Sequence, residues 1–214
     1  SLLALGLIAY ALYSIKLKKK VRSAALSAAS ELGQFKIIEK LGEGAMGVVY
    51  KAQHQLMQRE TAIKVLKNEI CRDVDLVQFE KEVQITCRLT HPNTICIYDY
   101  GKTREGLFYY AMEYLEGSDL QEIITKTGAI APERVVHFTK QICASLNEAH
   151  SMNLIHRDIK AQNVVVCNRG GIYDSIKVLD FGLVHDSNED GGHKVSGTPR
   201  YMAPEASSSR NEIH

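Results

Sequence analysis

Short runs of β-branched and aromatic residues dominate the chain between residues 35 and 112. Runs of this kind, bounded by glycine or charged residues, predict β-strands. One stretch, residues 75–89, interrupts them and predicts a helix, because its apolar residues recur at helical spacing. Those apolar residues are Leu76, Phe79, Val83 and Leu89. The predicted strands are residues 35–40, 48–52, 60–66, 95–100 and 107–112.

After Gly117 the pattern becomes helical. Residues 133–151 form the longest predicted helix, and Pro132 suits its first turn. The apolar positions of this helix include Val136, Ile142, Leu146 and Ala149. Short strands are predicted to flank a loop within residues 153–166 and at residues 176–179. A strand-rich half followed by a helix-rich half predicts an α+β fold with two lobes, and the sequence has no internal repeat.

The N-terminal stretch has a different pattern. Residues 1–15 carry no charge and precede Lys16, Lys18, Lys19 and Lys20. As a helix they would reach about 22 Å, short of a bilayer core of roughly 30 Å. We therefore expect residues 1–20 to be part of a transmembrane helix with a basic flank on the cytoplasmic side. A buried helix of a larger domain is the alternative, and a signal peptide is disfavoured because the basic residues follow the apolar stretch. Residues 21–34, rich in Ala and Ser, are interpreted as a juxtamembrane linker.

Composition narrows the functional classes. Hydrophobic residues make up 45% of the chain and charged residues 24%, as is usual for a globular protein. The formal net charge of +1 predicts no nucleic-acid partner. The 5 cysteines are scattered, and the 8 histidines show no zinc-ligand spacing, so neither a disulfide framework nor a zinc site is expected.

A glycine-rich motif occupies residues 42–49, with the pattern G-x-G-x-x-G-x-V. Glycines allow backbone N–H groups to approach phosphate oxygens closely. A flexible hairpin turn is the alternative interpretation. A dinucleotide site would place the glycines between a strand and a helix, whereas here a second predicted strand follows.

Lys64 ends an apolar strand, so its ammonium group must reach a polar environment. It is close enough along the chain to the glycine motif to reach the same phosphates, although a surface lysine remains the alternative. A carboxylate is needed to hold it, and Glu82 is preferred to Glu80. Glu82 lies beside the predicted buried face of its helix, at i+3 from Phe79.

Residues 156–163 concentrate chemically active side chains between apolar strands, which argues against a plain surface loop. Asp158 could accept a hydroxyl proton, Lys160 could neutralise phosphate charge, and Asn163 could bind a metal ion through its carbonyl oxygen. Asp180 follows an apolar strand and places a carboxylate where it could hold magnesium. Gly-Thr-Pro at residues 197–199 and Ala-Pro-Glu at residues 203–205 complete a set of five motifs.

These five motifs, in this order, resemble the signature set of eukaryotic-type protein kinases, over residues 35–205. GEGAMGVVYKA and SGTPRYMAPE are similar to membrane-anchored bacterial Ser/Thr kinases. The resemblance implies a β-rich N-lobe (residues 35–114), a helical C-lobe (115–214) and ATP with Mg²⁺ between them. It also implies that the C-lobe is incomplete, truncated after Ala-Pro-Glu, so this chain alone is expected to be a poor enzyme.

The resemblance implies a role for each matching residue. The catalytic residues would be Asp158, Lys160, Lys64 and Glu82, and the metal ligands Asn163 and Asp180. Lys160 favours the serine/threonine class, and Thr198 would brace Asp158 and Lys160. Arg157 would read phosphate on the activation loop, at Ser187 or Ser196, so Arg157, Ser187, Ser196 and Thr198 form the regulatory set. The ATP site would comprise Leu41, Gly42, Glu43, Gly44, Ala45, Met46, Gly47, Val48, Val49, Ala62, Lys64, Met112, Glu113, Leu115 and Val165.

The implied activity is transfer of the γ-phosphate of ATP to Ser/Thr hydroxyls of proteins, in signal transduction. The implied partners are protein substrates and a second copy of the kinase for trans-autophosphorylation, with the kinase domain cytoplasmic and anchored to the membrane. A nucleotide-binding pseudokinase or scaffold is the alternative, and the complete set of catalytic residues favours the active enzyme. Two departures are mild: Ala161 stands where proline is frequent, and residues 168–175 lengthen a turn.

Overall fold

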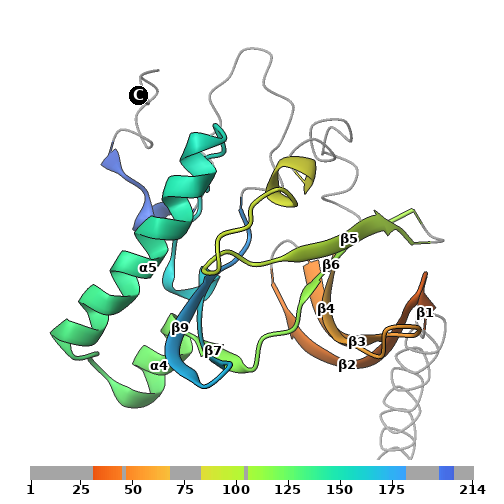
Figure 1. Ribbon diagram of the computed structural model, residues 1–214, viewed down its shortest axis with the longest axis horizontal. Coiled ribbons are helices and arrows are strands. Elements are labelled where there is room, and N and C mark those ends of the chain that lie inside the picture. The colour runs from red at the N-terminus through yellow and green to blue at the C-terminus, as the bar shows by residue number, and fades with distance from the viewer. Residues whose placement is uncertain (1–30, 45–46, 68–82, 104–105, 182–197, 205–214) are drawn as a thin grey trace, which may run out of the picture.

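The computed structural model describes residues 31–44, 47–67, 83–103, 106–181 and 198–204 (Figure 1). A six-stranded antiparallel sheet forms one lobe, in the order β1-β2-β3-β4-β6-β5. Its strands are β1 (Glu31–Leu32), β2 (Phe35–Glu43), β3 (Gly47–His54), β4 (Glu60–Leu66), β5 (Ile97–Lys102) and β6 (Phe108–Glu113).

The second lobe combines helices with a small sheet, and Figure 1 shows it beside the larger sheet. The predicted two-lobed α+β fold is therefore confirmed. The sheet has the order β7-β8-β9, and α5 packs against β9. The elements are β7 (Gly117–Asp119), α4 (Leu120–Thr127), α5 (Pro132–Ser151), η1 (Ala161–Asn163), β8 (Val164–Arg169), β9 (Ile172–Val178) and η2 (Pro199–Tyr201).

Alternation along the strands separates two cores in the first lobe. Tyr110 and Met112 of β6 face a core shared with Ala62, Leu66 and Ile97. Tyr109 and Ala111, the intervening residues, face a second core on the opposite side of the sheet, with Leu32, Phe35 and Ile63. β4 is buried along most of its length because Ala62 and Leu66 face one core and Ile63 faces the other.

The structure corrects several predicted boundaries. The sheet begins at Glu31, before the first predicted strand, because Leu32 pairs with Phe35 and is buried. β5 lies two residues later than predicted. Of the predicted helix at residues 75–89, residues 83–86 are helical and residues 75–82 lie outside the described part.

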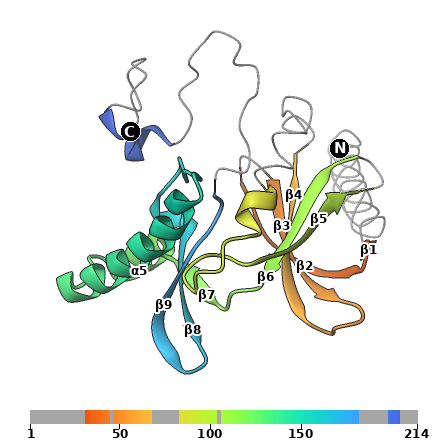
Figure 2. The same ribbon diagram turned by 45° about the horizontal axis from the view of Figure 1, so that its top comes forward.

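The long turn predicted at residues 168–175 is instead an extension of two strands. β8 and β9 continue to Arg169 and Ile172, which face each other across the turn. Gly170 and Gly171 have φ angles of 58° and 80°, as a tight hairpin turn requires. Figure 2 shows this hairpin as a blue ribbon that projects from the lobe.

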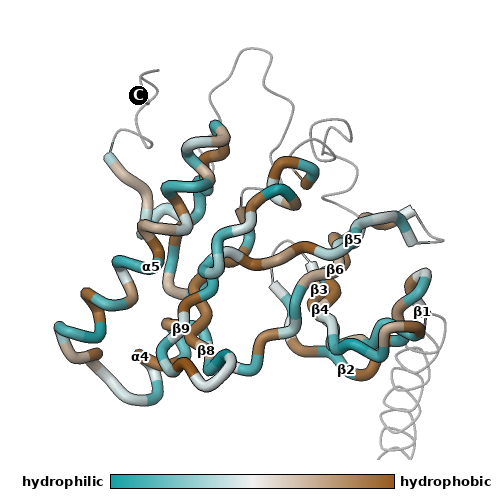
Figure 3. Tube along the Cα trace, in the orientation of Figure 1, coloured by the Kyte–Doolittle hydropathy of each residue, from teal (hydrophilic) through white to brown (hydrophobic). Residues whose placement is uncertain are grey.

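Helix α5 confirms the helix predicted at residues 133–151. Figure 3 shows hydrophobic and hydrophilic segments alternating along α5, as expected for a helix with one apolar face. Phe138, Ser145 and Ala149 are buried, whereas Val136, another apolar position of the predicted helix, is 53% exposed. Among the described helices, none is long and apolar enough to cross a membrane. Residues 1–30, which include the predicted anchor, lie outside the described part.

Gly47 stands where two strands come too close for a side chain. A Cβ atom at Gly47 would lie 2.3 Å from the carbonyl oxygen of Val65, which belongs to the facing strand. We expect Gly47→Ala to push β3 from β4 and to lower the free energy of unfolding by roughly 1–3 kcal/mol, as overpacking does. Denaturant unfolding measures this.

The matched control is Gly42→Ala in β2, where a Cβ would meet no atom within 4 Å. That substitution should be neutral or slightly stabilising, because alanine loses less chain entropy than glycine on folding. Equal destabilisation by both substitutions would contradict the argument.

Candidate active site

Lys64 lies at the centre of the larger sheet and points toward the second lobe. Register places it between Val49 of β3 and Tyr110 of β6. Its side chain is 10% exposed, and Nζ lies 2.7 Å from Oδ2 of Asp180. Glu82, the partner predicted from the sequence, lies outside the described residues, so that pairing stays a prediction. The carboxylate that Lys64 contacts comes from 116 positions further along the chain.

Asp180 follows β9 and receives hydrogen bonds from two side chains. Tyr110 Oη donates to Oδ1 at 2.8 Å, while Lys64 donates to Oδ2. Burial opposes ionisation of Asp180, but the Lys64 ammonium and the two hydrogen bonds outweigh it and hold its pKa below the usual range. Burial first, and then the charge of Asp180, raise the pKa of Tyr110. Asp180 is therefore a carboxylate and Tyr110 a neutral donor at neutral pH.

The backbone of the loop before Asp158 is held by the end of β9. His156 is buried, and its Nε2 lies 2.7 Å from the carbonyl oxygen of Leu179. Because a carbonyl only accepts, Nε2 donates there, and Nδ1 accepts from the N–H of Asp158 at 3.3 Å. Burial lowers the pKa of His156, which favours this neutral form. The ring of Phe181, itself fully buried, lies 4.7 Å from the His156 ring.

Asp158 is surrounded by donors from Lys160 of its own loop and from Thr198. Lys160 Nζ lies 2.6 Å from Oδ2, and Thr198 donates to Oδ1 through its N–H at 3.0 Å and its hydroxyl at 2.7 Å. The Thr198 hydroxyl also accepts from Lys160 Nζ at 3.0 Å. Burial opposes ionisation of Asp158, yet Lys160 and Thr198 together lower its pKa. The structure thus brings together Asp158, Lys160 and Thr198.

Asn163 links this cluster to Asp180. Its side-chain Nδ2 donates to the backbone carbonyl oxygen of Asp158 at 2.8 Å and to Oδ2 at 3.3 Å, and its backbone carbonyl oxygen accepts from the N–H of Leu179 at 2.8 Å. Magnesium prefers oxygen ligands and keeps several water or phosphate oxygens. The amide oxygen of Asn163 and the charged carboxylate of Asp180 fit such an ion. Within the described residues, no group of three His, Cys, Asp or Glu could hold a metal by itself.

Comparison with known proteins identifies the family. Residues 35–213 match the family described as "Protein kinase domain". The chain belongs to the protein kinase family. It is 36% identical over 180 residues to serine/threonine-protein kinase pkn3 of Myxococcus xanthus, which covers 80% of this chain and 33% of that protein. It is 34% identical over 177 residues to serine/threonine-protein kinase PrkC of Bacillus subtilis, with 81% and 26% covered.

The kinase fold is also found among solved structures. The kinase domain of Mycobacterium tuberculosis PknI matches with a TM-score of 0.61 and 29% identity, covering 72% of this chain and 62% of that one. The present chain spans about a third or less of the curated relatives it matches, between 26% and 33% in the two compared above.

The predicted nucleotide-binding residues fall on both lobes of this kinase. Ala62 and Met112 are buried in one core, and Val49 and Leu115 pack against it. Val165 lies on β8, opposite Lys177. The remaining predicted residues that the structure describes are Leu41, Gly42, Glu43 and Gly44 of the β2 end and Gly47 and Val48 of β3. Ala45 and Met46 lie outside the described residues.

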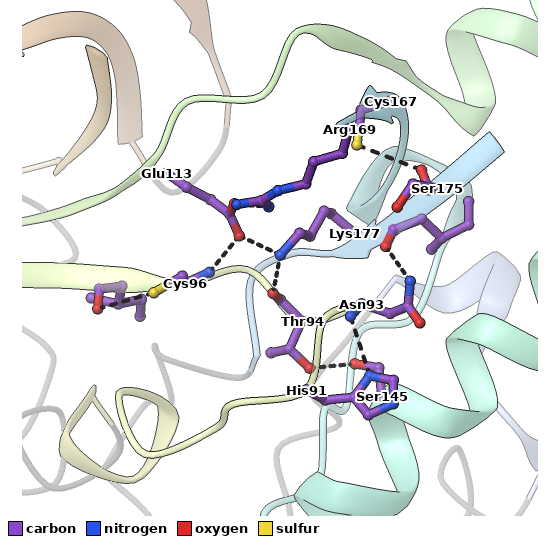
Figure 4. A network of polar contacts seen from close by, with 12 residues as sticks. His91, Asn93, Thr94, Cys96, Glu113, Ser145, Cys167, Arg169, Ser175 and Lys177 are labelled. Atoms are coloured by element: carbon purple, nitrogen blue, oxygen red, sulfur yellow. Dashed lines mark hydrogen bonds and ion pairs between the residues drawn. The ribbon is translucent and has the colours of Figure 1, made fainter. Parts of the chain in front are cut away.

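Glu113, predicted at the hinge of the ATP site, places its side chain in a buried polar network with Lys177 (Figure 4). Its side chain is 4% exposed, and Oε1 accepts from Lys177 Nζ at 2.6 Å and from the N–H of Cys96 at 2.9 Å. Lys177 also donates to the carbonyl oxygen of Thr94 at 2.9 Å, and Arg169 contacts Oε2 of Glu113. The Glu113 side chain is thus fully engaged by these polar partners, and its place in the ATP site stays a prediction.

Sequence reasoning missed Lys177, Thr94 and Tyr110. A signal existed for Lys177, since a lysine within the apolar run Ile-Lys-Val-Leu must be paired if that strand is buried. Ser187 and Ser196, the predicted phosphorylation sites, lie outside the described residues. The role of Arg157 as a reader of their phosphates stays a prediction.

The lowered pKa of Asp158 predicts a specific dependence of stability on pH. Its folded pKa lies below the unfolded value of about 3.9, so its contacts stabilise the fold above that pH and are lost as the pH falls through the folded pKa. We expect the free energy of unfolding of the wild type to exceed that of Asp158→Asn most above about pH 5. The difference should shrink on acidification. Denaturant unfolding of both proteins between neutral and acidic pH measures it, and a difference independent of pH would contradict the assignment.

Proposed function

We propose that the chain is the catalytic part of a serine/threonine protein kinase that transfers the γ-phosphoryl group of Mg-ATP to protein hydroxyls. The observation that carries the proposal is the Asp158 carboxylate, which Lys160, Thr198 and Asn163 hold in its charged form. Asp158 is connected to the Lys64–Asp180 pair through Leu179, the residue before Asp180. The backbone of Leu179 is hydrogen-bonded to both Asn163 and His156, which flank Asp158 in the loop.

The proposed mechanism assigns each side chain one task. Asp158 orients the incoming serine or threonine hydroxyl and takes its proton. Lys160 neutralises negative charge beside it, and its bond to Thr198 fixes where its ammonium lies. Lys64 binds ATP phosphates from the sheet above. Asn163 and Asp180 would hold magnesium, which supplies positive charge next to the phosphoryl group.

The charge and exposure of Asp158 suit it to accept a proton from a hydroxyl group. A charged carboxylate with one side turned to solvent can accept a hydroxyl proton, and Asp158 keeps 15% of its side chain exposed. The substrates we propose are proteins that bear serine or threonine, a second copy of the kinase among them.

The decisive test is Asp158→Asn in the full-length kinase. Loss of the proton acceptor should lower turnover with Mg-ATP by about 10²–10⁴-fold, with a modest change in ATP affinity, because the loss falls on the transition state. The measurement is phosphate incorporation into serine or threonine of a protein substrate.

Asp174→Asn is the matched control. Asp174 is also a charge-paired aspartate, bound by Arg134 at 2.6 Å, but it lies on the β8–β9 hairpin. The control should retain turnover. Undiminished turnover in Asp158→Asn would refute the role of Asp158, whereas a wild-type protein without turnover would favour the pseudokinase.

We also propose that residues 1–20 anchor the kinase to a membrane, with the kinase domain on the cytoplasmic face. The support is the uncharged run at residues 1–15 followed by four lysines. The full-length protein should sediment with membranes and be released by detergent but not by high salt. A variant lacking residues 1–15 should appear in the supernatant. Recovery of the full-length protein in the soluble fraction would rule out the anchor.

A further inference from the structure

Tyr110 is a buried side chain that the proposed mechanism does not use. It lies on β6, directly opposite Lys64 in the register of β4 and β6. Residues opposite each other on adjacent strands project from the same face of the sheet. Both side chains accordingly reach the same group: Tyr110 binds Oδ1 of Asp180 at 2.8 Å, and Lys64 binds Oδ2 at 2.7 Å.

The two donors differ in what else they must do. Lys64 carries the charge that ATP phosphates require, so its ammonium is shared between Asp180 and the nucleotide in the proposed mechanism. Tyr110 is 2% exposed and packed among Ala62, Leu66 and Met112, and its hydroxyl makes one described bond, to Asp180. Tyr110 is therefore the donor that stays on Asp180 when Lys64 turns to phosphate.

The backbone of Asp180 increases its dependence on side-chain contacts. Its φ angle is 53°, a conformation that residues other than glycine adopt at a cost. Such a backbone conformation persists where surrounding contacts hold it, and the bonds from Tyr110 and Lys64 are among those contacts. Each carboxylate oxygen has two lone-pair directions, so one bond to each oxygen leaves the others available to a cation.

We propose that Tyr110 is a positioning residue for magnesium: its hydroxyl orients the Asp180 carboxylate so that the remaining lone pairs can bind the ion that accompanies the nucleotide. The inference rests on the proposed role of Asp180 as a magnesium ligand. The competing explanation is that Asp180 merely satisfies a hydroxyl that belongs to the core. The two explanations differ in whether removing the hydroxyl changes the response to magnesium.

The test is Tyr110→Phe in the full-length kinase, with ADP affinity measured by calorimetry in EDTA and across a Mg²⁺ titration. Hydrogen bonds to charged acceptors are the strong ones, so loss of this bond should raise the Mg²⁺ concentration needed for half-maximal strengthening by about tenfold. Affinity in EDTA should stay within about twofold, because no phosphate or base contact is removed.

Tyr109→Phe is the matched control. Tyr109 is the preceding residue of β6, is also buried, and faces the opposite core with Leu32 and Phe35. The substitution removes a tyrosine hydroxyl that does not contact Asp180. The ADP affinity of this variant should therefore depend on Mg²⁺ as that of the wild type does. In an Asp180→Asn background, Tyr110→Phe should produce no further change, since contacting groups are not additive.

The outcomes separate the two levels of the proposal. A wild-type kinase whose ADP affinity does not respond to Mg²⁺ would overturn the role of Asp180 itself. A wild type that responds, with Tyr110→Phe responding equally, would overturn the inference about Tyr110. Equal losses of ADP affinity in EDTA and in Mg²⁺, together with a lower melting temperature, would assign Tyr110 to the core and also overturn it.

Discussion

The ion pair between Lys64 and Asp180 joins the two lobes through charge, and the rest of the site is arranged around it. Lys64 is 10% and Asp180 28% exposed, so both groups have lost much of their hydration. Removing one partner of a buried pair costs about 3–5 kcal/mol, and the partial exposure of Asp180 places this pair at or below the lower end. The pair forms only when the larger sheet and the end of β9 hold Lys64 and Asp180 within hydrogen-bonding distance of each other.

Backbone contacts at the end of β9 carry this constraint to the catalytic loop. Leu179 binds His156 through its carbonyl oxygen and Asn163 through its N–H, so displacement of Asp180 displaces both. Phe181 fills the space beside His156. Strained positive φ angles at Arg157 and Asp180 are held within this frame, which is how such conformations persist in folded proteins.

A second buried network of charged and polar groups also connects the two lobes, away from the Lys64–Asp180 pair. Glu113 of β6, Lys177 of β9 and the Thr94 carbonyl share bonds, and Asn93 binds both Gln141 of α5 and the Ile176 carbonyl. Glu148 of α5 accepts from Thr90 and His91. Residues 90–94, which precede β5, therefore contact the second lobe, while β5 itself belongs to the larger sheet. The two lobes are therefore connected by polar contacts in two places, at Lys64–Asp180 and at Glu113–Lys177.

The sequence by itself determined the family, the two-lobed α+β fold, the positions of most strands and of α5, and the identities of Lys64, Asp158 and Asp180 as charged groups at strand ends or in a loop. These features are local: glycine spacing, apolar periodicity and short motifs record them directly. The tertiary structure alone decided which groups meet. It paired Glu113 with Lys177, extended the β8–β9 hairpin, and brought Tyr110 and Lys64 onto one carboxylate. The physical reason is that strand register determines which face of the sheet each strand residue occupies and which residues it meets. Register is set by pairing between segments that are far apart in the chain.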